Sequence, residues 1–388
     1  MFSERTHWQL TRNRLTSALE EIRSSRARLL DLTLSNPTRA GLHYDQSLIL
    51  TSLASPHALD YDPQAKGLPG ARGAVADYYR SQHGEQLDLD RLILTTSTSE
   101  GYSFVFRLLC NPGEELLVPK PSYPLFEFLA DLQDVRLAPY PLIYDHGWQM
   151  DFPTLEKAVT ERTRGVVVVH PNNPTGSFVK THELRWLNAF CRQHKLALIA
   201  DEVFLDYAHD GVTRPSFVAN KDVLTFTLSG VSKISALPQM KLAWIGASGP
   251  EAEVEEAMAR LDVISDTYLS MSAPIQWATP RLLEQRRSIQ RQLLDRLRSN
   301  LGELDRQLAG QKSCERLRVE GGWYAVLRVP VTRSDEELAV DLLLRKSVLV
   351  HPGHFYDFPG DGYLVLSLIT KQEEFGEGIG RLLEVVSG

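Results

Sequence analysis

The sequence predicts an α/β protein with two domains, and two observations carry this prediction. From residue 91 onward, continuous apolar runs rich in β-branched residues alternate with helical segments. Such alternation is typical of a mainly parallel sheet that is covered by helices on both faces. The C-terminal part of the chain instead mixes short strands with helices, which indicates a smaller α+β domain. Two domains also suit a chain of 388 residues, because that length exceeds one ordinary hydrophobic core.

The strands of the larger sheet are expected where short apolar runs are separated by helical segments. These runs cover residues 91–96, 115–118, 135–137, 165–170, 196–200, 223–228 and 242–245. Helices are expected between them at 99–109 and 122–132. In the smaller domain we expect strands at 324–329 and 363–368 and helices at 335–346 and 374–386.

The domain boundaries are placed where the pattern of strands and helices changes. The large domain is expected to comprise residues 42–275, and the small domain to combine residues 1–41 with residues 276–388. One long helix over 276–307 is expected to join them, because its charged sequence keeps an apolar stripe. An amphipathic helix is also expected within residues 3–30, where apolar residues recur at roughly helical spacing: Trp8, Leu15, Leu19, Ile22 and Leu29.

Composition and charge exclude several classes of function. The formal charge is −7 with a sequence pI near 5.9, and no basic stripe is present, so nucleic-acid binding has no support. The N-terminus is polar, and the longest apolar runs, such as 166–169, are too short to cross a bilayer. Three cysteines without metal-like spacing indicate reduced thiols. We therefore expect a cytoplasmic protein without a membrane segment. His351 and His354 have a metal-like spacing but no obvious partners, so no metal site is expected.

The stretch 223–246 contains the residue that decides the chemistry. An apolar strand is expected at 223–228, small residues interrupt it, and Lys233 follows. A lysine held at the end of a buried strand suits an amine that must be partly desolvated and directed at a carbonyl group, as a Schiff-base lysine must be. A lone lysine at such a place is more often an exposed loop residue. The residues at the ends of the neighbouring strands therefore distinguish between the two interpretations.

Three other strand ends carry polar residues, and ligands of such a sheet bind at the carboxyl ends of its strands. Ser97, Thr98 and Ser99 open a helix, which offers hydroxyl and amide groups to an anion or forms an ordinary cap. Asn173 lies in a turn after the strand at 165–170. Asp201 directly follows another buried strand, where a carboxylate could cap a helix, bind a metal or hold a protonated ring nitrogen.

Together these residues are the set that pyridoxal phosphate requires. Its phosphate binds amides and hydroxyls, its ring nitrogen pairs with a carboxylate, its phenolic oxygen accepts from a donor and its aldehyde reacts with a lysine. Competing chemistries lack their motifs. Residues 230–234 miss the second glycine of a G-x-S-x-G elbow, and His182-Glu183 is followed by no histidine that would complete H-E-x-x-H.

On these motifs the sequence resembles the fold-type I pyridoxal-phosphate aminotransferases of classes I and II, the aspartate aminotransferase superfamily. The resemblance covers nearly the whole chain, and the motifs occur in the family's order. It implies a mainly parallel sheet of seven strands in the large domain. It also implies that Lys233 binds the cofactor's aldehyde, that Asp201 pairs with the ring nitrogen and that Asn173 donates to the phenolic oxygen.

The resemblance implies further cofactor contacts and an assembly. Tyr123 matches the aromatic residue stacked on the ring, and Tyr61 matches a tyrosine that reaches the neighbouring subunit's phosphate. The last match implies a homodimer with composite active sites. The residues expected at the phosphate are Ser97, Thr98, Ser99 and Ser232.

Three positions depart from the family pattern. Phe204 stands where a tyrosine usually bonds the phenolic oxygen, and Lys241 stands where an arginine usually binds the phosphate. Val365 stands where the family carries the arginine that clamps the substrate's α-carboxylate. Arg39 or Arg328 could replace that arginine, and Asn36 and Asn173 are further residues expected near the substrate.

The predicted function is therefore that of an aminotransferase, with an amino acid or related primary amine as donor and a 2-oxo acid as second substrate. The alternative keeps the cofactor and the fold but ends in elimination, decarboxylation or cyclisation. Val365 favours that alternative to some extent, because it removes the expected partner of the carboxylate.

Overall fold

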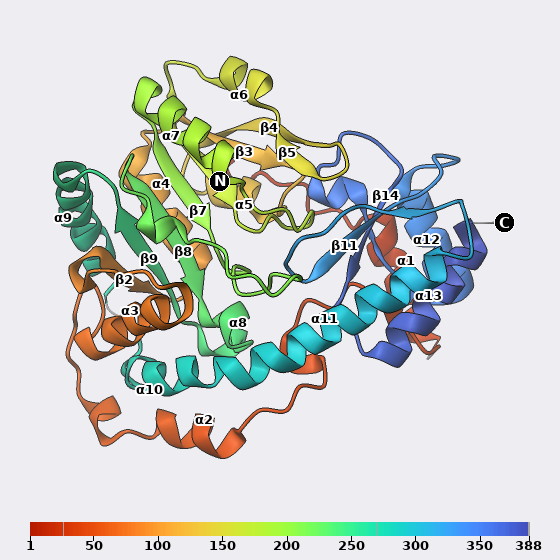
Figure 1. The fold of residues 1–388 in the computed structure, drawn as a ribbon, viewed down its shortest axis with the longest axis horizontal. Coiled ribbons are helices and arrows are strands. Elements are labelled where there is room, and N and C mark those ends of the chain that lie inside the picture. Colours follow the sequence, from red (N-terminus) through yellow and green to blue (C-terminus); the bar gives the residue numbers. More distant parts are fainter. Residues whose placement is uncertain (26, 270, 387–388) are drawn as a thin grey trace.

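The computed structural model describes residues 1–25, 27–269 and 271–386, and its largest feature is a sheet of eight strands (Figure 1). The strands run in the order β2-β9-β8-β7-β6-β3-β4-β5. Neighbours from β8 to β4 are parallel, whereas β9 runs antiparallel to both β2 and β8. The strands are β2 (Leu92–Thr95), β3 (Glu115–Lys120), β4 (Arg136–Tyr144), β5 (Trp148–Met150), β6 (Thr163–Val169), β7 (Ala197–Asp201), β8 (Thr225–Gly230) and β9 (Ala243–Ser248).

The predicted fold class is confirmed, but the expected number of strands, seven, is wrong by one. β5 forms an antiparallel hairpin with β4 at the edge of the sheet. The sequence analysis expected this strand at residues 135–137, whereas β4 continues to Tyr144. Only Tyr140 and Leu142 are buried in β4, so this strand lacks the continuous apolar run that marked the central strands.

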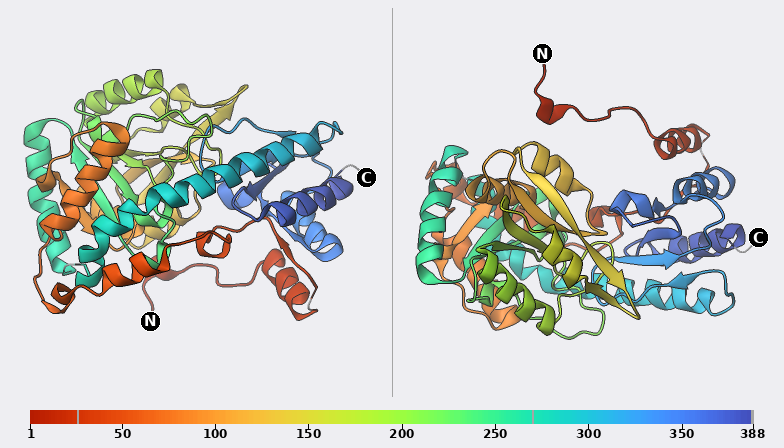
Figure 2. Two further views of the ribbon diagram at one scale, coloured as in Figure 1. Left: turned by 60° about the horizontal axis from the view of Figure 1, so that its bottom comes forward. Right: turned by 90° about the horizontal axis from the view of Figure 1, so that it is seen from above.

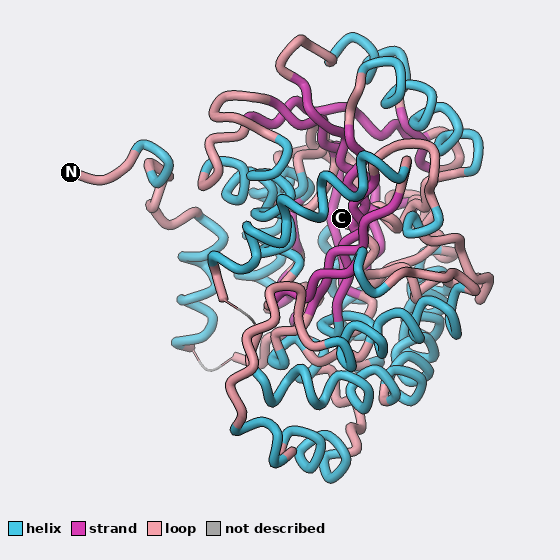
Figure 3. Tube along the Cα trace, turned by 90° about the vertical axis from the view of Figure 1, so that its left-hand side faces the viewer, coloured by secondary structure: helices cyan, strands magenta, loops and turns pink. Residues whose placement is uncertain are grey.

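Helices cover both faces of this sheet, and Figure 3 shows its strands in magenta between them. Consecutive side chains of a strand point to opposite faces. Accordingly, Val166 and Val168 of β6 pack in one core cluster with Leu187, whereas Val167 and Val169 pack in a second cluster. The covering helices are α3 (Pro69–His83), α7 (Thr181–His194) and α10 (Ala273–Glu284) on one face and α4 (Thr98–Leu109), α5 (Leu125–Asp131) and α9 (Glu251–Thr267) on the other.

The second part of the fold is built around an antiparallel sheet in the order β10-β11-β14-β13. The N-terminal segment joins this part, because β1 (Leu30–Asp31) pairs with β12 (Val348–Leu349). The other elements here are β10 (Glu315–Arg316), β11 (Tyr324–Arg328), β13 (His351–Pro352), β14 (Tyr363–Ser367), α12 (Asp335–Lys346) and α13 (Gln372–Val386).

The helix expected within residues 3–30 is shorter than predicted. The structure has α1 at Arg14–Ser24, where Asn13 caps the first turn by accepting from the amide of Thr16. Leu15 and Ile22 are buried as expected. Trp8 lies before the helix and donates from its indole nitrogen to Asp131 at 2.8 Å. Its ring also packs edge-on against Phe128 of α5, with 5.4 Å between the ring centroids.

The helix expected over 276–307 is divided in two, α10 and α11 (Arg286–Leu308), with the junction at Gln285. Two backbone carbonyls at the junction accept from side chains. The hydroxyl of Ser235 donates to Leu282, and the guanidinium of Arg286 donates to Leu283. Side chains that bond helix carbonyls in this way bend a helix. α11 then extends from the larger sheet to the smaller one (Figures 1 and 2).

No helix among residues 1–25, 27–269 and 271–386 combines the length and hydropathy of a membrane-spanning segment. The same residues contain no cluster of three or more His, Cys, Asp or Glu side chains placed to hold a metal ion.

Candidate active site

A cavity of about 430 Å³ lies where the carboxyl ends of the central strands meet the smaller sheet. Residues that follow β2, β3, β6, β7 and β8 form one side of it, and residues from β11, β13 and the turn after β13 form the other. The sheet topology thus brings together residues that are far apart in the sequence. The lining includes the predicted residues Ser97, Thr98, Ser99, Tyr123, Asn173, Asp201, Phe204, Ser232, Lys233 and Lys241.

Lys233 enters the cavity from α8 (Val231–Ile234), a four-residue helix that starts directly after β8. Gly230 makes this tight connection possible, because a Cβ there would lie 2.8 Å from Ala243 Cβ and 2.8 Å from the Leu242 carbonyl oxygen. The lysine Nζ lies 5.0 Å from the ring centroid of Trp323 and 5.6 Å from that of Phe204. Burial lowers the pKa of Lys233 to about 8, although the attraction of Asp201 raises it.

Asp201 ends β7 and faces the same cavity. Its carboxylate accepts from the hydroxyl of Tyr102 and from the amide of Val203, both at 3.0 Å. Burial raises the pKa of Asp201 to about 6 despite these bonds and the attraction of Lys233. The carboxyl group therefore remains mainly ionised at pH 7, in a site that strongly penalises its charge.

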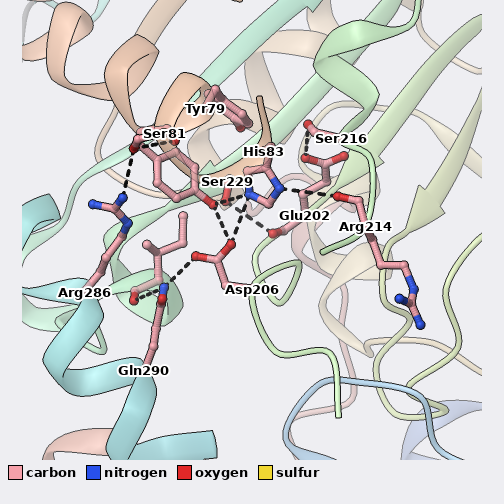
Figure 4. A network of polar contacts seen from close by, with 12 residues as sticks. Tyr79, Ser81, His83, Glu202, Asp206, Arg214, Ser216, Ser229, Arg286 and Gln290 are labelled. Atoms are coloured by element: carbon pink, nitrogen blue, oxygen red, sulfur yellow. Dashed lines mark hydrogen bonds and ion pairs between the residues drawn. The ribbon is translucent and has the colours of Figure 1, made fainter. Parts of the chain in front are cut away.

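The adjacent Glu202 points away from the cavity. Its carboxylate accepts from the hydroxyl of Ser216 and the amide of Phe217, both at 2.6 Å (Figure 4). Burial raises the pKa of Glu202 to about 7. Of the two acidic residues that follow this strand in the sequence, only Asp201 can meet a ligand in the cavity.

The N-terminus of α4 opens on the cavity. Ser97 is its cap, and the side-chain oxygen accepts from the amide of Glu100 at 3.2 Å. The exposed amides of a first helical turn attract anions. Thr98 and Ser99 add hydroxyl groups, and Lys241 adds a positive charge to the same lining. This end of the cavity is suited to a phosphate group.

The residues present fit pyridoxal phosphate. An amine, a buried carboxylate and an anion cradle lie around one cavity, as the cofactor's aldehyde, ring nitrogen and phosphate require. The side-chain oxygen of Asn173 is buried without a hydrogen-bond partner. A buried acceptor of this kind is costly unless a donor from a ligand or water completes it. The expected bond to the phenolic oxygen would come from the other side-chain atom of Asn173, the amide nitrogen, which donates. Tyr123, expected to stack on the ring, is partly exposed in the same cavity.

The other predicted residues are not part of this lining. Tyr61 is 76% exposed, and Asn36 and Arg39 are exposed, with the side-chain oxygen of Asn36 accepting from Thr38. Nη1 of Arg328 lies 3.5 Å from Oε2 of Glu315 at the surface. Val365 is fully buried. Among the residues that the structure describes, no arginine lines the cavity.

Sequence reasoning missed most of the second side of the cavity. Tyr324 and His351 come from β11 and β13, and Phe355 and Tyr356 follow β13. His351 had been considered only as a metal ligand, but its Nδ1 lies 3.1 Å from the hydroxyl of Tyr356. Only the pairing of β13 with β14 brings these residues to the carboxyl ends of the larger sheet. No local sequence pattern marks them.

The fold and the cavity define an enzyme of the pyridoxal-phosphate class. The chain belongs to the family of class I and II aminotransferases, whose model matches residues 49–379. This membership confirms the resemblance inferred from the motifs. The protein is accordingly a pyridoxal-phosphate-dependent aminotransferase, and transfer is favoured over the elimination, decarboxylation or cyclisation alternatives.

Known relatives are similar over most of their length. The alanine aminotransferase of Mycobacterium tuberculosis is 28% identical over 371 residues, which are 92% of this chain and 85% of that protein. The glutamate-pyruvate aminotransferase AlaA of Escherichia coli is 25% identical over 372 residues, 93% of this chain and 91% of that protein. The solved alanine aminotransferase of Pyrococcus furiosus shares the fold, with a TM-score of 0.90, 21% identity and full coverage of both chains.

The lowered pKa of Lys233 can be measured in the protein freed of cofactor. With a dilute amine-reactive label and peptide mass spectrometry, we expect half-maximal labelling of Lys233 near pH 8, instead of the ordinary lysine value of about 10.4. Asp201→Asn is expected to lower this midpoint further, because it removes the negative charge that stabilises the ammonium form. Other lysine peptides of the same digest serve as internal controls. A midpoint of Lys233 above pH 10 would contradict the buried environment.

Proposed function

We propose that this aminotransferase moves an amino group from an amino acid to a 2-oxo acid, with Lys233 as its catalytic amine. The observation that carries the proposal is the desolvated Nζ of Lys233, directed into the same cavity as the carboxylate of Asp201. The relatives support the substrate class, because their names give alanine in one case and glutamate and pyruvate in the other as their substrates.

Pyridoxal phosphate, when bound, supplies an aldehyde carbon that reacts with amines and a ring that withdraws electrons from the substrate's Cα. The part of Lys233 would be to hold the cofactor through Nζ, to take a proton from the substrate's Cα and to deliver it to the cofactor carbon that carried the aldehyde; the reverse transfer would serve the second substrate. An amine with a pKa of about 8 suits both directions of this transfer, since both of its protonation states are populated near neutral pH. The part of Asp201 is to hold the proton on the ring nitrogen.

The remaining cofactor contacts follow from the positions of the lining residues. The first turn of α4, with Ser97, Thr98 and Ser99, is proposed to bind the phosphate together with Ser232 and Lys241. Asn173 is proposed to donate to the phenolic oxygen. Phe204, which is buried against Trp323, cannot supply the second donor that a tyrosine there would provide. Asn173 would then be the main donor to that oxygen.

The substrate end of the cavity consists of aromatic and neutral groups. Burial lowers the pKa of His351 although Asp31 raises it, so the imidazole is uncharged near pH 7. Val365 pairs directly with His351 across the smaller sheet, and such partners share one face of a sheet. His351 thus lies on the lining, and Val365 lies buried beside it. We propose that neutral donors, namely the hydroxyl groups of Tyr324 and Tyr356 and the imidazole of His351, bind the substrate's carboxylate.

The assembly and the domain boundaries are further parts of the proposal. A homodimer is supported by large apolar side chains exposed on one part of the surface, with Leu59 92% and Tyr61 76% exposed beside α10. Tyr61 is proposed to reach the phosphate bound in the partner subunit. The large domain is proposed to comprise 42–275, and the small domain 1–41 and 276–388. The three cysteines are free thiols, which suits the proposed location in the cytoplasm.

Replacing the amine should remove both catalysis and covalent attachment of the cofactor. We expect Lys233→Ala to reduce transfer to background and to lose the label that borohydride reduction leaves on the wild-type holoenzyme. Lys221→Ala, at an exposed lysine, is the matched control and should retain both. Turnover by Lys233→Ala at the wild-type rate would remove the proposed mechanism.

The absence of a guanidinium from the described lining predicts a weak requirement for the donor's carboxylate. A charge-assisted pair contributes about 1.5–3 kcal/mol, or roughly 10- to 150-fold. We therefore expect kcat/KM for L-alaninamide to lie within about tenfold of that for L-alanine, since neutral donors serve both groups. A loss beyond about 100-fold would indicate that an arginine reaches the substrate after all, for example from the partner subunit.

The proposed dimer can be tested together with Tyr61. Sedimentation of the holoenzyme should give twice the chain mass of 43.7 kDa. Tyr61→Phe should remain dimeric but lose cofactor affinity by roughly tenfold, because one hydrogen bond to the phosphate is missing. A fully active monomer, or a Tyr61→Phe dimer with wild-type affinity, would contradict the composite site.

A further inference from the structure

A second group of buried polar side chains, which includes His83, Asp206 and Gln290, contacts the backbone next to Lys233 (Figure 4). At its centre is Asp206, whose side chain is fully buried, as is that of His83. The carboxylate accepts from the hydroxyl of Tyr78 at 3.0 Å and from the amide of Gln290 at 2.6 Å. Nε2 of His83 lies 3.1 Å from the same carboxylate. Three partners from α3 and α11 therefore fix the position of one buried charge.

The amide of Gln290 connects this carboxylate to the lysine segment. Its Nε2 donates to Asp206 and also to the backbone carbonyl of Ile234, at 2.9 Å. Ile234 follows Lys233 in the chain. A primary amide has two protons on its nitrogen, so both bonds can form at once. Asp206 holds one of them, and this fixes the orientation in which the other reaches Ile234.

The carbonyl of Lys233 itself also accepts from a side chain, that of the residue after Asp206. The hydroxyl of Tyr207 donates to the carbonyl of Lys233 at 2.7 Å. α8 has only four residues, and the last carbonyls of a helix have no partners within it. The Lys233 carbonyl also accepts from the amide of Ala236 at 3.1 Å, so Tyr207 adds a second bond there. The Ile234 carbonyl has its partner in Gln290.

The loop that holds the lysine backbone also carries the carboxylate of the cavity. Asp201 ends β7, and Asp206 and Tyr207 follow within the next six residues. Asp201 faces the cavity, whereas Asp206 and Tyr207 face the back of α8. The loop that begins at Asp201 therefore also contacts the segment of Lys233, on the opposite side of the backbone.

We propose that Gln290, oriented by Asp206, is a positioning residue that keeps the Nζ of Lys233 in place for proton transfer, an inference that rests on the proposed role of Lys233. Gln290 is suited to this because α11 is itself anchored at the smaller sheet. The amide of Asn300, further along α11, donates to the carbonyls of Leu368 and Thr370 at 2.8 and 2.7 Å. Gln290 therefore acts on the lysine segment from a helix that is held at a distance from the cavity.

Gln290→Met tests the proposal, because it keeps the approximate length of the side chain and removes both hydrogen bonds. The matched control is Gln292→Met on the same helix, whose amide bonds the backbone of His43 at 2.8 and 2.9 Å. We expect Gln290→Met to lower kcat about 10- to 100-fold with less than about threefold change in KM, since small displacements of a reacting group have effects of this size. Gln292→Met should change neither constant.

A second measurement needs no cofactor. In the apoprotein, the pH midpoint for labelling of Lys233 should rise in Gln290→Met, because an amine that is held less firmly in the cavity meets more water. The midpoint in Gln292→Met should stay at about 8. A purely structural role of Gln290 would lower the melting temperature without moving either the midpoint or kcat.

The outcomes separate this proposal from the proposed function. A folded Gln290→Met protein with wild-type kcat and labelling midpoint would overturn the positioning role. If Gln290→Met does not fold, Asp206→Asn decides, since it keeps the size of the side chain and changes the group that orients the amide of Gln290. A lowered kcat in that variant supports positioning, and a wild-type kcat overturns it. A wild-type enzyme without transfer would remove the proposed function, whereas the labelling midpoints would still test the position of Lys233.

Discussion

The burial of one amine and one carboxylate in the same cavity is the constraint on which the rest of the structure depends. Lys233 and Asp201 both lose most of their hydration. Burial lowers the pKa of Lys233 and raises the pKa of Asp201, so it favours the neutral form of each group. Each group partly compensates the other through its charge. Neither could remain stable at its position without the opposite charge nearby or a bound ligand. The fold must therefore deliver the two residues to one place and hold them there.

The parallel register of the central strands achieves the first of these tasks. Asp201, the last residue of β7, pairs with Leu228 near the end of β8. The two strands therefore end close together, and the segment of Lys233 follows β8 directly. The connection through Gly230 leaves no room for a side chain, and the segment turns into α8 at once. The antiparallel smaller sheet then covers these strand ends. Tyr324 of β11 lines the cavity, and the ring centroid of the adjacent Trp323 lies 5.0 Å from Nζ of Lys233. Both sheets are needed, because each contributes only one side of the cavity.

The larger sheet and its polar strand ends could be predicted because their signals are local. Continuous apolar runs marked the central strands, and Ser97, Asp201 and Lys233 each follow such a run. β4 was predicted too short, and the edge strand β5 was missed, because their burial is interrupted and the apolar run is broken. The junction at Gln285 depends on Ser235, which is distant in the sequence and reaches a carbonyl of α10. His351 and Tyr356 come to the cavity only through strand pairing, for which a single sequence holds no local mark.

The same reasoning explains why a buried charge is found behind the lysine segment. An apolar residue at position 206 would pack well, but it could not orient the amide of Gln290, and the carbonyl of Ile234 would lose its partner. Burial lowers the pKa of His83, yet the hydrogen bond and charge of Asp206 outweigh this, and the net pKa is raised. The two side chains, both buried, lie 3.1 Å apart from Nε2 of His83 to the carboxylate of Asp206. A charge network of this kind contributes little to stability by itself, so its value lies in the single geometry that it imposes on the backbone of Lys233.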